Sequence, residues 1–346
     1  MTKRQVVIDA LEFRTPAYVP WEWGPTQQCA ARLKKHLRRQ RLEDFLDNHF
    51  VTVGAPAGRW DSTKGNLVRD AYGVVWDRTV DQDIGTPCQW PIRRPEDLER
   101  YVWPDANNDD WYADIPARLA AMSDRFRVYS IGFSLFERAW TMRGMEDLLV
   151  DMVERPEFLE RFLDRIVEHN LVQVRRALAL GVDAVYFGDD YGMQRGLIMG
   201  IAHWRHFIRP RLARMFAPVR EAGKYVSMHS CGRVEELFDD LVGIGLNLFN
   251  PFQPEVMDTF ALMKKYRGKL AFHGGLSIQK TLPFGTPTEV EQATRRLIEA
   301  GSAGGYVFAP SHGVPRDVPP ENLLAMVGVL KGQGGYRSES RMTNVE

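Results

Sequence analysis

The 346-residue sequence lacks the features that mark secreted, membrane and nucleic-acid-binding proteins. It has three cysteines (Cys29, Cys88 and Cys231), too few and too scattered for a disulfide framework. Lys+Arg and Asp+Glu balance at 45 each, so no overall field draws the chain to nucleic acid or anionic lipid. Residues 1–5 carry no apolar signal region, and no run of about 18 apolar residues could span a bilayer. We expect a soluble, cytoplasmic protein.

Several common catalytic motifs are also missing. The chain has no Gly-x-Gly-x-x-Gly, no phosphate loop, no Gly-x-Ser-x-Gly and no His-Glu-x-x-His. These absences argue against a nucleotide enzyme, a serine hydrolase with a nucleophile elbow and a zincin. Hydrophobic residues make up 44% of the sequence, which is ample for a large core. A local basic run at 32–39 predicts the solvated face of a helix.

From residue 126 onward, short apolar runs alternate with amphipathic segments. The predicted strands are 126–133, 183–188, 225–229, 246–251, 270–274 and 306–309. The predicted helices are 145–179 (divided at 155–157), 203–223, 234–244, 256–266, 287–300 and 320–331. At the start of the fifth helix, Thr286 is a predicted N-cap, Pro287 the first helical residue and Glu289 the partner in a capping box.

The earlier part of the chain is less regular. Helices are predicted over 5–13 and 27–40, and two further strands over 18–23 and 74–76. The second of these strands lies in a segment, 66–94, that is predicted to form a strand or hairpin excursion. The two strands bring the total to eight. Strict alternation of strands and helices predicts an α/β fold, a single (β/α)8 TIM-type barrel with an irregular N-terminal region. We expect one domain over 1–335 and a polar C-terminal tail over 336–346.

Polar side chains follow the predicted strands with unusual consistency. In a parallel barrel the catalytic groups lie at the carboxyl ends of the strands, so these residues are the candidates for the site. They are Glu22, Glu137, Asp189, Asp190, His229, Cys231, Asn250, His273 and His312.

His229 and Cys231 are the most informative pair. Two residues apart on an extended segment, they project to the same side. An imidazole and a thiolate so placed are good zinc ligands, and a catalytic zinc needs a third protein ligand. His312 is the preferred third ligand, with His273 or a carboxylate (Glu22 or Glu137) as alternatives. A metal-free acid/base site and a structural role for the pair stay open.

The remaining candidates are assigned by chemistry. Asp189 and Asp190 are neighbours, so at most one is expected to face the cavity while the other caps a turn or helix. A cavity carboxylate could orient a metal-bound His, act as general base or bind substrate. The predicted catalytic residues are Asp189, Asp190, Glu22 and His273. The predicted substrate-binding residues are Trp21, Trp23, Glu137, Tyr191 and Asn250, with core packing as the alternative for the aromatic ones.

At these residues the sequence resembles the uroporphyrinogen decarboxylase superfamily. The resemblance covers most of the chain and is carried by a set of short motifs. They are Asp70-Ala71-Tyr72-Gly73-Val74, Trp103-Pro104-Asp105, Gly188-Asp189-Asp190-Tyr191-Gly192-Met193-Gln194, His229-Ser230-Cys231-Gly232, Phe272-His273-Gly274-Gly275, the segment 280–287, Pro310-Ser311-His312-Gly313 and Glu321-Asn322. The resemblance implies a distorted (β/α)8 barrel.

The resemblance is closer to the zinc- and corrinoid-dependent methyltransferase branch than to the true decarboxylases. The decarboxylases carry an early Arg-rich segment that grips substrate carboxylates, whereas residues 21–28 contain no arginine. The methyltransferase branch keeps a His-x-Cys pair as zinc ligands, which matches His229 and Cys231. Its usual third ligand is a second Cys near the final strand, where this chain has Ser311 and His312.

The sequence therefore predicts metal-assisted methyl transfer between a corrinoid or methylated substrate and a small acceptor. The expected cofactor is zinc, and a corrinoid protein is the implied partner. The first alternative is a decarboxylase or lyase that acts on a carboxylated substrate, with uroporphyrinogen decarboxylation itself disfavoured. The second is a non-catalytic ligand-binding barrel. A small-molecule substrate and a homodimer are expected; nucleic acid and membrane partners are not.

Overall fold

The structure is a computed structural model that describes residues 1–55, 61–62 and 65–336. The chain divides into two compact units. Unit 1 holds Met1–Val51, Asp124–Phe126 and Asn247–Glu346, and unit 2 holds Thr52–Ser123 and Arg127–Leu246. The expected tail over 336–346 lies outside the described residues except for Tyr336. The expectation of one domain over 1–335 stays a prediction.

Three parallel strands of the main sheet form the centre of unit 2. They are β6 (Phe126–Ile131, whose first residue is assigned to unit 1), β7 (Ala184–Gly188) and β10 (Tyr225–His229). β6 pairs with β7, and β7 pairs with β10, in a register that places His229 opposite Gly188. The residues that follow β7 and β10 therefore leave the sheet at the same edge, and these are the predicted site residues.

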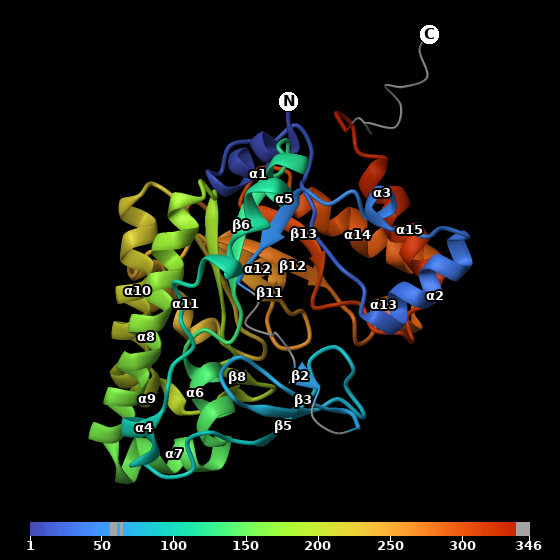
Figure 1. The fold of residues 1–346 in the computed structure, drawn as a ribbon. Coiled ribbons are helices and arrows are strands. Elements are labelled where there is room, and N and C mark those ends of the chain that lie inside the picture. Colours follow the sequence, from blue (N-terminus) through green and yellow to red (C-terminus); the bar gives the residue numbers. More distant parts are fainter. Residues whose placement is uncertain (56–60, 63–64, 337–346) are drawn as a thin grey trace. The chain divides into compact units, whose positions relative to one another are not determined.

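Helices cover these strands. The longest pair, α8 (Pro156–Ala179) and α10 (Arg209–Glu221), pack against each other (Figure 1). α8 buries a stripe at helical spacing, including Phe158, Phe162 and Ile166, which is why this segment forms a surface helix. The other helices are α4 (Asp97–Arg100), η1 (Asp109–Trp111), α5 (Ile115–Ala121), α6 (Phe136–Arg143), α7 (Met145–Glu154), α9 (Gly200–His203), the π-helical turn η2 (Trp204–Ile208), η3 (Glu235–Leu237) and α11 (Phe238–Gly243).

Unit 2 also contains a four-stranded antiparallel sheet in the order β2-β3-β4-β5, and a short pair, β8 (Gly192–Met193) and β9 (Gly196–Leu197). The four strands are β2 (Asp61–Ser62), β3 (Leu67–Arg69), β4 (Val75–Asp77) and β5 (Thr86–Gln89). The predicted strand or hairpin excursion over 66–94 is therefore a set of hairpins. The count of 74–76 as a barrel strand is wrong, because this segment is the second arm of the first hairpin. The Asp70 carboxylate accepts the backbone N–H groups of Tyr72 and Val74 and so closes the turn.

Unit 1 contains the last three strands of the main sheet. They are β11 (Leu248–Phe252), β12 (Ala271–Leu276) and β13 (Tyr306–Pro310), paired in parallel in that order. β12 and β13 are buried along their whole length, as expected for strands covered on both faces. His273, which lies opposite Val307, sits within β12 and not after it.

The predicted strand over 18–23 forms a shorter contact than expected. It pairs with β13 through one parallel bridge, Trp21 to Phe308, and Glu22 N donates to Phe308 O at 3.1 Å. On its other side, His49 N donates to Trp21 O at 3.0 Å. His49 immediately precedes β1 (Phe50–Val53), which the sequence analysis missed. The segment therefore takes the place of the eighth strand next to β13.

The helices of unit 1 begin where local sequence signals place them. The Thr286 side chain and Glu289 form the predicted capping box at the start of α14 (Pro287–Gly301), which packs against α15 (Pro320–Lys331). The remaining helices are α1 (Lys3–Leu11), α2 (Gln27–Leu37), α3 (Glu43–Leu46), α12 (Thr259–Lys265) and α13 (Thr281–Phe284).

The main sheet holds seven described strands: β1, β6, β7, β10, β11, β12 and β13. The predicted α/β fold class with parallel strands and covering helices is confirmed, with the eighth strand reduced to the bridge at Trp21.

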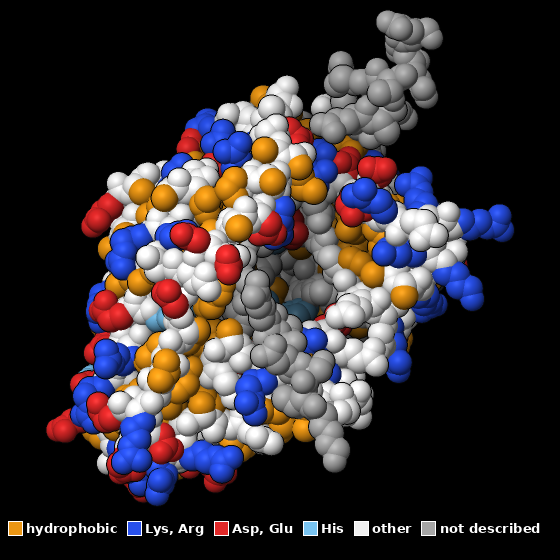
Figure 2. Space-filling view, in the orientation of Figure 1, with side chains coloured by type: hydrophobic (Ala, Val, Ile, Leu, Met, Phe, Trp, Pro, Cys, Tyr) orange, Lys and Arg blue, Asp and Glu red, His pale blue; other side chains and the backbone are white. Residues whose placement is uncertain are grey.

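Positively and negatively charged side chains are both distributed over the visible surface (Figure 2). Lys and Arg side chains gather over α2, while the rest of the visible face mixes both signs (Figure 2). Among the described helices, none combines the length and apolarity needed to cross a membrane.

Candidate active site

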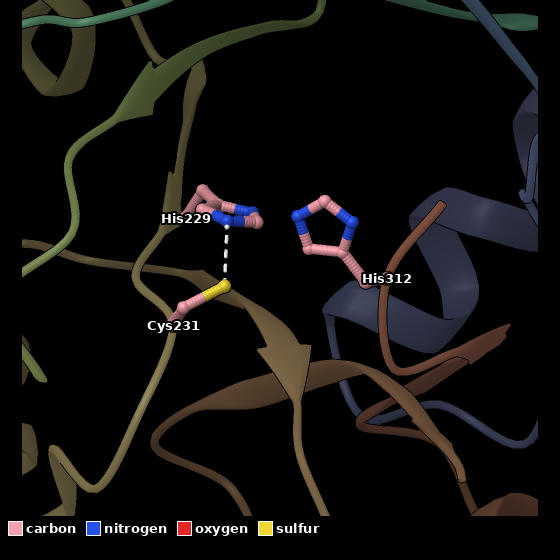
Figure 3. A group of neighbouring side chains, drawn as sticks. All are labelled: His229, Cys231 and His312. Atoms are coloured by element: carbon pink, nitrogen blue, oxygen red, sulfur yellow. Dashed lines mark hydrogen bonds between the residues drawn. The ribbon is translucent and has the colours of Figure 1, made fainter. Parts of the chain in front are cut away.

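His229 and Cys231 lie together at the end of β10. The Cys231 Sγ atom is 3.3 Å from His229 Nε2 (Figure 3). Both side chains are partly buried. The two side chains therefore project to the same side of the chain, as predicted. The thiol sulfur and one imidazole nitrogen lie next to each other.

The chain around this pair is held by two glycines. Gly232 has φ +83°, and a Cβ there would lie 2.3 Å from the carbonyl carbon of Gly192. A side chain at Gly232 would therefore be both strained and blocked. The loops that follow β7 and β10 touch backbone to backbone at this point, which fixes Cys231 beside the residues after β7.

Asp190 faces the pair. Its Oδ1 atom accepts the Cys231 backbone N–H at 2.7 Å and lies 3.5 Å from His229 Nε2. The Asp190 side chain is 36% exposed, so its carboxylate is open to solvent. The carboxylate therefore lies beside the same imidazole nitrogen that the Cys231 thiol contacts.

Asp189 has a different task. Its carboxylate is fully buried and accepts the backbone N–H of Phe136 at 2.9 Å and of Glu137 at 2.6 Å. It also accepts the Tyr191 hydroxyl at 2.5 Å. Burial raises the pKa of Asp189 to about 7. Asp189 is thus the helix-capping member of the pair, and it holds the start of α6.

Glu137 completes an acidic cluster in unit 2. Burial, and then the charges of Asp190 and Asp189, raise its pKa well above the ordinary value. Burial and the charges of Asp190 and Glu137 also raise the pKa of the Cys231 thiol. The region thus holds more acidic groups than it can ionise without a compensating positive charge. Such a place favours a bound cation or retained protons.

A second group of predicted residues lies in unit 1. His273 Nδ1 accepts the Asn250 side-chain N–H at 3.3 Å, and its Nε2–H donates to the Glu22 carbonyl at 3.0 Å. The Glu22 carboxylate oxygen Oε2 is 3.8 Å from the same nitrogen. These bonds fix a neutral imidazole with its proton on Nε2. Burial raises the pKa of Glu22 to about 7, so this carboxyl can exchange a proton near neutral pH.

His312 follows β13 in unit 1, and its side chain is exposed. The preceding residue anchors the loop: Ser311 N donates to Leu276 O at 2.7 Å, and the Ser311 hydroxyl accepts the Ile278 N–H at 3.3 Å. The loop that carries His312 is therefore tied to the end of β12. Its role as third metal ligand stays a prediction.

The predicted aromatic residues lie mostly in the core. Trp21 is buried, and its indole N–H donates to Leu46 O at 2.9 Å. Tyr191 is buried and bonded to Asp189. Trp23 differs, because its indole nitrogen is buried with no hydrogen-bond partner among the described residues. Of the three, Trp23 is the one whose polar atom the described residues leave unsatisfied.

The sequence analysis missed Glu255, which lies three residues after β11. One carboxylate oxygen accepts the Ser277 hydroxyl. The other, Oε2, is buried without a partner among the residues described. The signal was present, since Glu255 is a polar residue after a strand, but the predicted strand ended at 251 and the next helix began at 256, so residues 252–255 were given no role.

Comparisons with known proteins agree with the fold. The family model "Uroporphyrinogen decarboxylase (URO-D)" matches residues 77–333. A uroporphyrinogen decarboxylase of Chlorobaculum tepidum is 22% identical over 287 residues, covering 77% of this chain and 76% of its own. That of Geobacillus kaustophilus is 26% identical over 263 residues, covering 71% of each.

Among solved structures, a methyltransferase from Methanosarcina mazei superposes with a TM-score of 0.71 at 15% identity. The match covers 96% of this chain and 98% of the methyltransferase. At this identity the likeness concerns the fold, which is TIM-like.

Proposed function

Because the chain belongs to the uroporphyrinogen decarboxylase (URO-D) family, we propose that it is a family member that transfers methyl groups with the help of zinc. The convergence of Cys231 Sγ and His229 Nε2 carries the proposal. The zinc ligands would be His229, Cys231 and His312, which make up a group of side chains able to offer one ligand atom each. The methyl group would pass between a corrinoid protein or methylated substrate and a small acceptor.

The donor chemistry fits zinc. Zinc–sulfur and zinc–nitrogen bonds of about 2.3 and 2.0 Å at a tetrahedral angle place the two ligand atoms roughly 3.5 Å apart. The 3.3 Å between Cys231 Sγ and His229 Nε2 is close to this separation. The acidic groups Asp190 and Glu137 around the thiol favour a divalent cation. Two or three protein ligands leave a coordination position for a substrate.

Zinc bound there would act as a Lewis acid that lowers the pKa of the heteroatom giving or accepting the methyl group. The residues of the chain would do the rest. Asp190 lies beside the His229 nitrogen that would bind zinc, and its partly exposed carboxylate can take the proton that an acceptor thiol loses. Asp189 holds α6 and thereby the position of Glu137. In unit 1, Glu22 and His273 offer a further acid/base pair for polar groups of the substrate.

The same observations disfavour decarboxylation of a tetra-acidic porphyrinogen. Carboxylates are usually bound by bidentate arginine, and residues 21–28 contain none. Acidic groups line the site instead. The neighbour from Methanosarcina mazei, named a methyltransferase, supports the choice of branch only through its fold.

A corrinoid assay tests the proposal. The purified chain is mixed with methylcobalamin and a thiol, and demethylation is followed by the visible absorbance of the corrinoid. We expect turnover that a chelator abolishes and added zinc restores. Cys231→Ser should abolish it, whereas the matched control Cys88→Ser, at an exposed free cysteine, should not. Turnover that persists in Cys231→Ser would overturn the proposal.

The names of the relatives favour a second candidate, a decarboxylase or lyase for a carboxylated substrate. Glu22 and His273 would then carry the acid/base chemistry. Release of CO2 from a porphyrinogen tetra-acid, unaffected by a chelator, would establish this reading in place of methyl transfer.

A further inference from the structure

A separate pocket lies at the opposite ends of the unit 1 strands from the candidate active site. It has a volume of about 240 Å³ and is formed by Phe13 (just after α1), by α12 and Arg267 just after it, by the end of α14 and by the turn before β13. Gly304 and Gly305 of its floor immediately precede β13, whereas His312 follows that strand. The pocket therefore has no part in the chemistry proposed above.

The pocket has a mixed lining, in which the large apolar side chains are Phe13, Phe260 and Met263. The rest is polar or made of small residues. Phe260 keeps 41% of its surface exposed, which is unusual for so large an apolar side chain. The Arg296 guanidinium lies 5.2 Å from the centre of its ring and holds it from the outer side.

The backbone around the pocket is specialised to make room for the Phe13 ring. Phe13 has φ +56°, a conformation that side-chain-bearing residues rarely adopt. A Cβ at Gly305 would lie 2.4 Å from the ring of Phe13, so the ring can occupy this place only because residue 305 is glycine. The position of the Phe13 ring is therefore fixed by the backbone conformation and by the glycine at 305.

Two cations stand beside the apolar walls. Lys264 and Arg267 both line the pocket and are exposed. In the part of the chain that the structure describes, neither forms an ion pair. An apolar wall next to two uncompensated positive charges matches a ligand with an apolar body and one anionic group, since each part of the ligand then meets its complement.

We propose that this pocket binds a small organic anion, an aromatic or short-chain molecule that carries one phosphate or carboxylate. The ring or chain lies between Phe13 and Phe260, and the anionic group pairs with Lys264 and Arg267. The proposal does not depend on the reaction at the active site. A ligand here would make a second, remote site for a metabolite on the barrel.

Phenyl phosphate is a suitable probe because it combines one ring with one phosphate. Calorimetric titration of the full chain should give saturable binding in the millimolar range. Inorganic phosphate and phenol, each carrying half of the recognised chemistry, should bind at least about tenfold more weakly. Raising the salt concentration should weaken binding, because exposed charges are screened.

Variants separate this site from general attraction to a basic surface. The double variant Lys264→Ala/Arg267→Ala should bind phenyl phosphate at least about tenfold more weakly. Its matched control, Lys265→Ala/Lys269→Ala, removes the same charge from positions that do not line the pocket and should stay within about twofold. Phe260→Ala, which removes a largely exposed ring, should weaken binding while the thermal melting temperature is retained.

The proposal is overturned by any of three results. The first is that phenyl phosphate binds no better than inorganic phosphate. The second is that the control variant and the pocket variant weaken phenyl phosphate binding equally. The third is that titration gives no saturable heat. Zinc content and methyl transfer are unaffected by any of these results, so failure here leaves the proposed function standing.

Discussion

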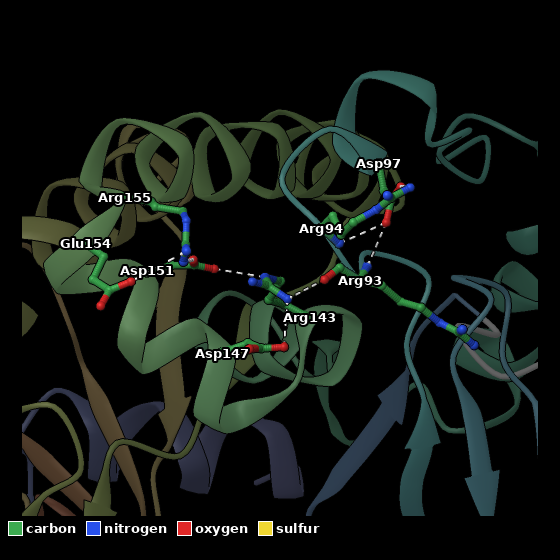
Figure 4. A network of polar contacts seen from close by, with 8 residues as sticks. All are labelled: Arg93, Arg94, Asp97, Arg143, Asp147, Asp151, Glu154 and Arg155. Carbon is green, nitrogen blue, oxygen red and sulfur yellow. Dashed lines mark hydrogen bonds and ion pairs between the residues drawn. The ribbon is translucent and has the colours of Figure 1, made fainter.

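Unit 2 contains two groups of acidic side chains, one paired with arginine and one without an arginine partner among the described residues. Around Asp151, which is fully buried, Arg143 Nε donates at 2.8 Å and Arg155 Nη1 at 3.0 Å (Figure 4). Around Cys231, by contrast, Asp190 and Glu137 have no arginine ion pair among the described residues. The first group is neutralised within the chain, whereas in the second burial raises the pKa values of Glu137 and Cys231, so that they favour retained protons or a bound cation.

The paired group has a structural role, whereas the unpaired group is suited to binding a ligand. Arg143 also donates to the Arg93 carbonyl at 2.8 Å and pairs with Asp147, so its guanidinium is used for joining α6, α7 and the segment before α4. A closed network of this kind has nothing left to offer a ligand. The acidic group near His229 is incomplete without a cation or protons, and that incompleteness is what a metal-binding active site requires.

The largest expected effect breaks the neutralised group. Asp151→Ala should lower the free energy of unfolding by about 3–5 kcal/mol, because the buried Arg143 guanidinium loses its buried carboxylate and keeps only the largely exposed Asp147 as an ion-pair partner. Urea unfolding of the wild type and the variant measures this, with Asp147→Ala, at a largely exposed partner of the same arginine, as the control. A loss below about 1 kcal/mol would show that the network does not hold the helices together.

Asp189→Ala should cost about 1–3 kcal/mol, because the N–H groups of Phe136 and Glu137 lose their acceptor in a buried place. The cost should depend on pH with a definite sign. The folded-state pKa of Asp189 is raised, to about 7, so its stabilising contribution is complete below the unfolded value near 4 and is lost as the pH rises through 7.

The stability difference between wild type and Asp189→Ala should therefore be larger at pH 5 than at pH 8. Urea midpoints at the two pH values give this difference directly. A difference that grows with pH would mean that the carboxylate is stabilised in its charged form, which would contradict the burial argument.

The smallest effect on stability is expected at the candidate site. Asp190→Asn should change the free energy of unfolding by less than about 0.5 kcal/mol, since the carboxylate is partly exposed and an amide oxygen can still accept the Cys231 N–H. Zinc affinity should nevertheless fall by roughly 10-fold, because Asn removes a negative charge 3.5 Å from the His229 nitrogen that would bind the metal. A competition titration with a zinc chelator measures the affinity. An unchanged affinity would remove Asp190 from the site.

Much of the barrel could be predicted because its signals are local. Tyr225–His229 and Pro320–Lys331 were predicted with their observed ends, and the capping box at Thr286 is present. Apolar runs and capping residues act over a few neighbours, so one sequence suffices to read them. The fold class followed from their alternation.

The sequence was least informative where contacts between distant segments determine the local structure. The segment near Val75 has the composition of a barrel strand, but the Asp70 turn makes it a hairpin arm. Which of Asp189 and Asp190 caps a helix depends on the start of α6, more than 50 residues earlier in the chain. Glu255 follows a strand as the other candidates do, but its second oxygen is buried without a partner among the described residues through tertiary packing, which no local pattern encodes.

The central claim is that His229 and Cys231 hold zinc, and metal analysis of the purified chain tests it most directly. We expect about one zinc per chain in the wild type. Stoichiometric zinc should be lost in His229→Ala and Cys231→Ser and weakened in His312→Ala, with His206→Ala, at a histidine paired with Glu160, as the control that keeps it. Wild-type protein without zinc after reconstitution, or full zinc content in Cys231→Ser, would contradict the account.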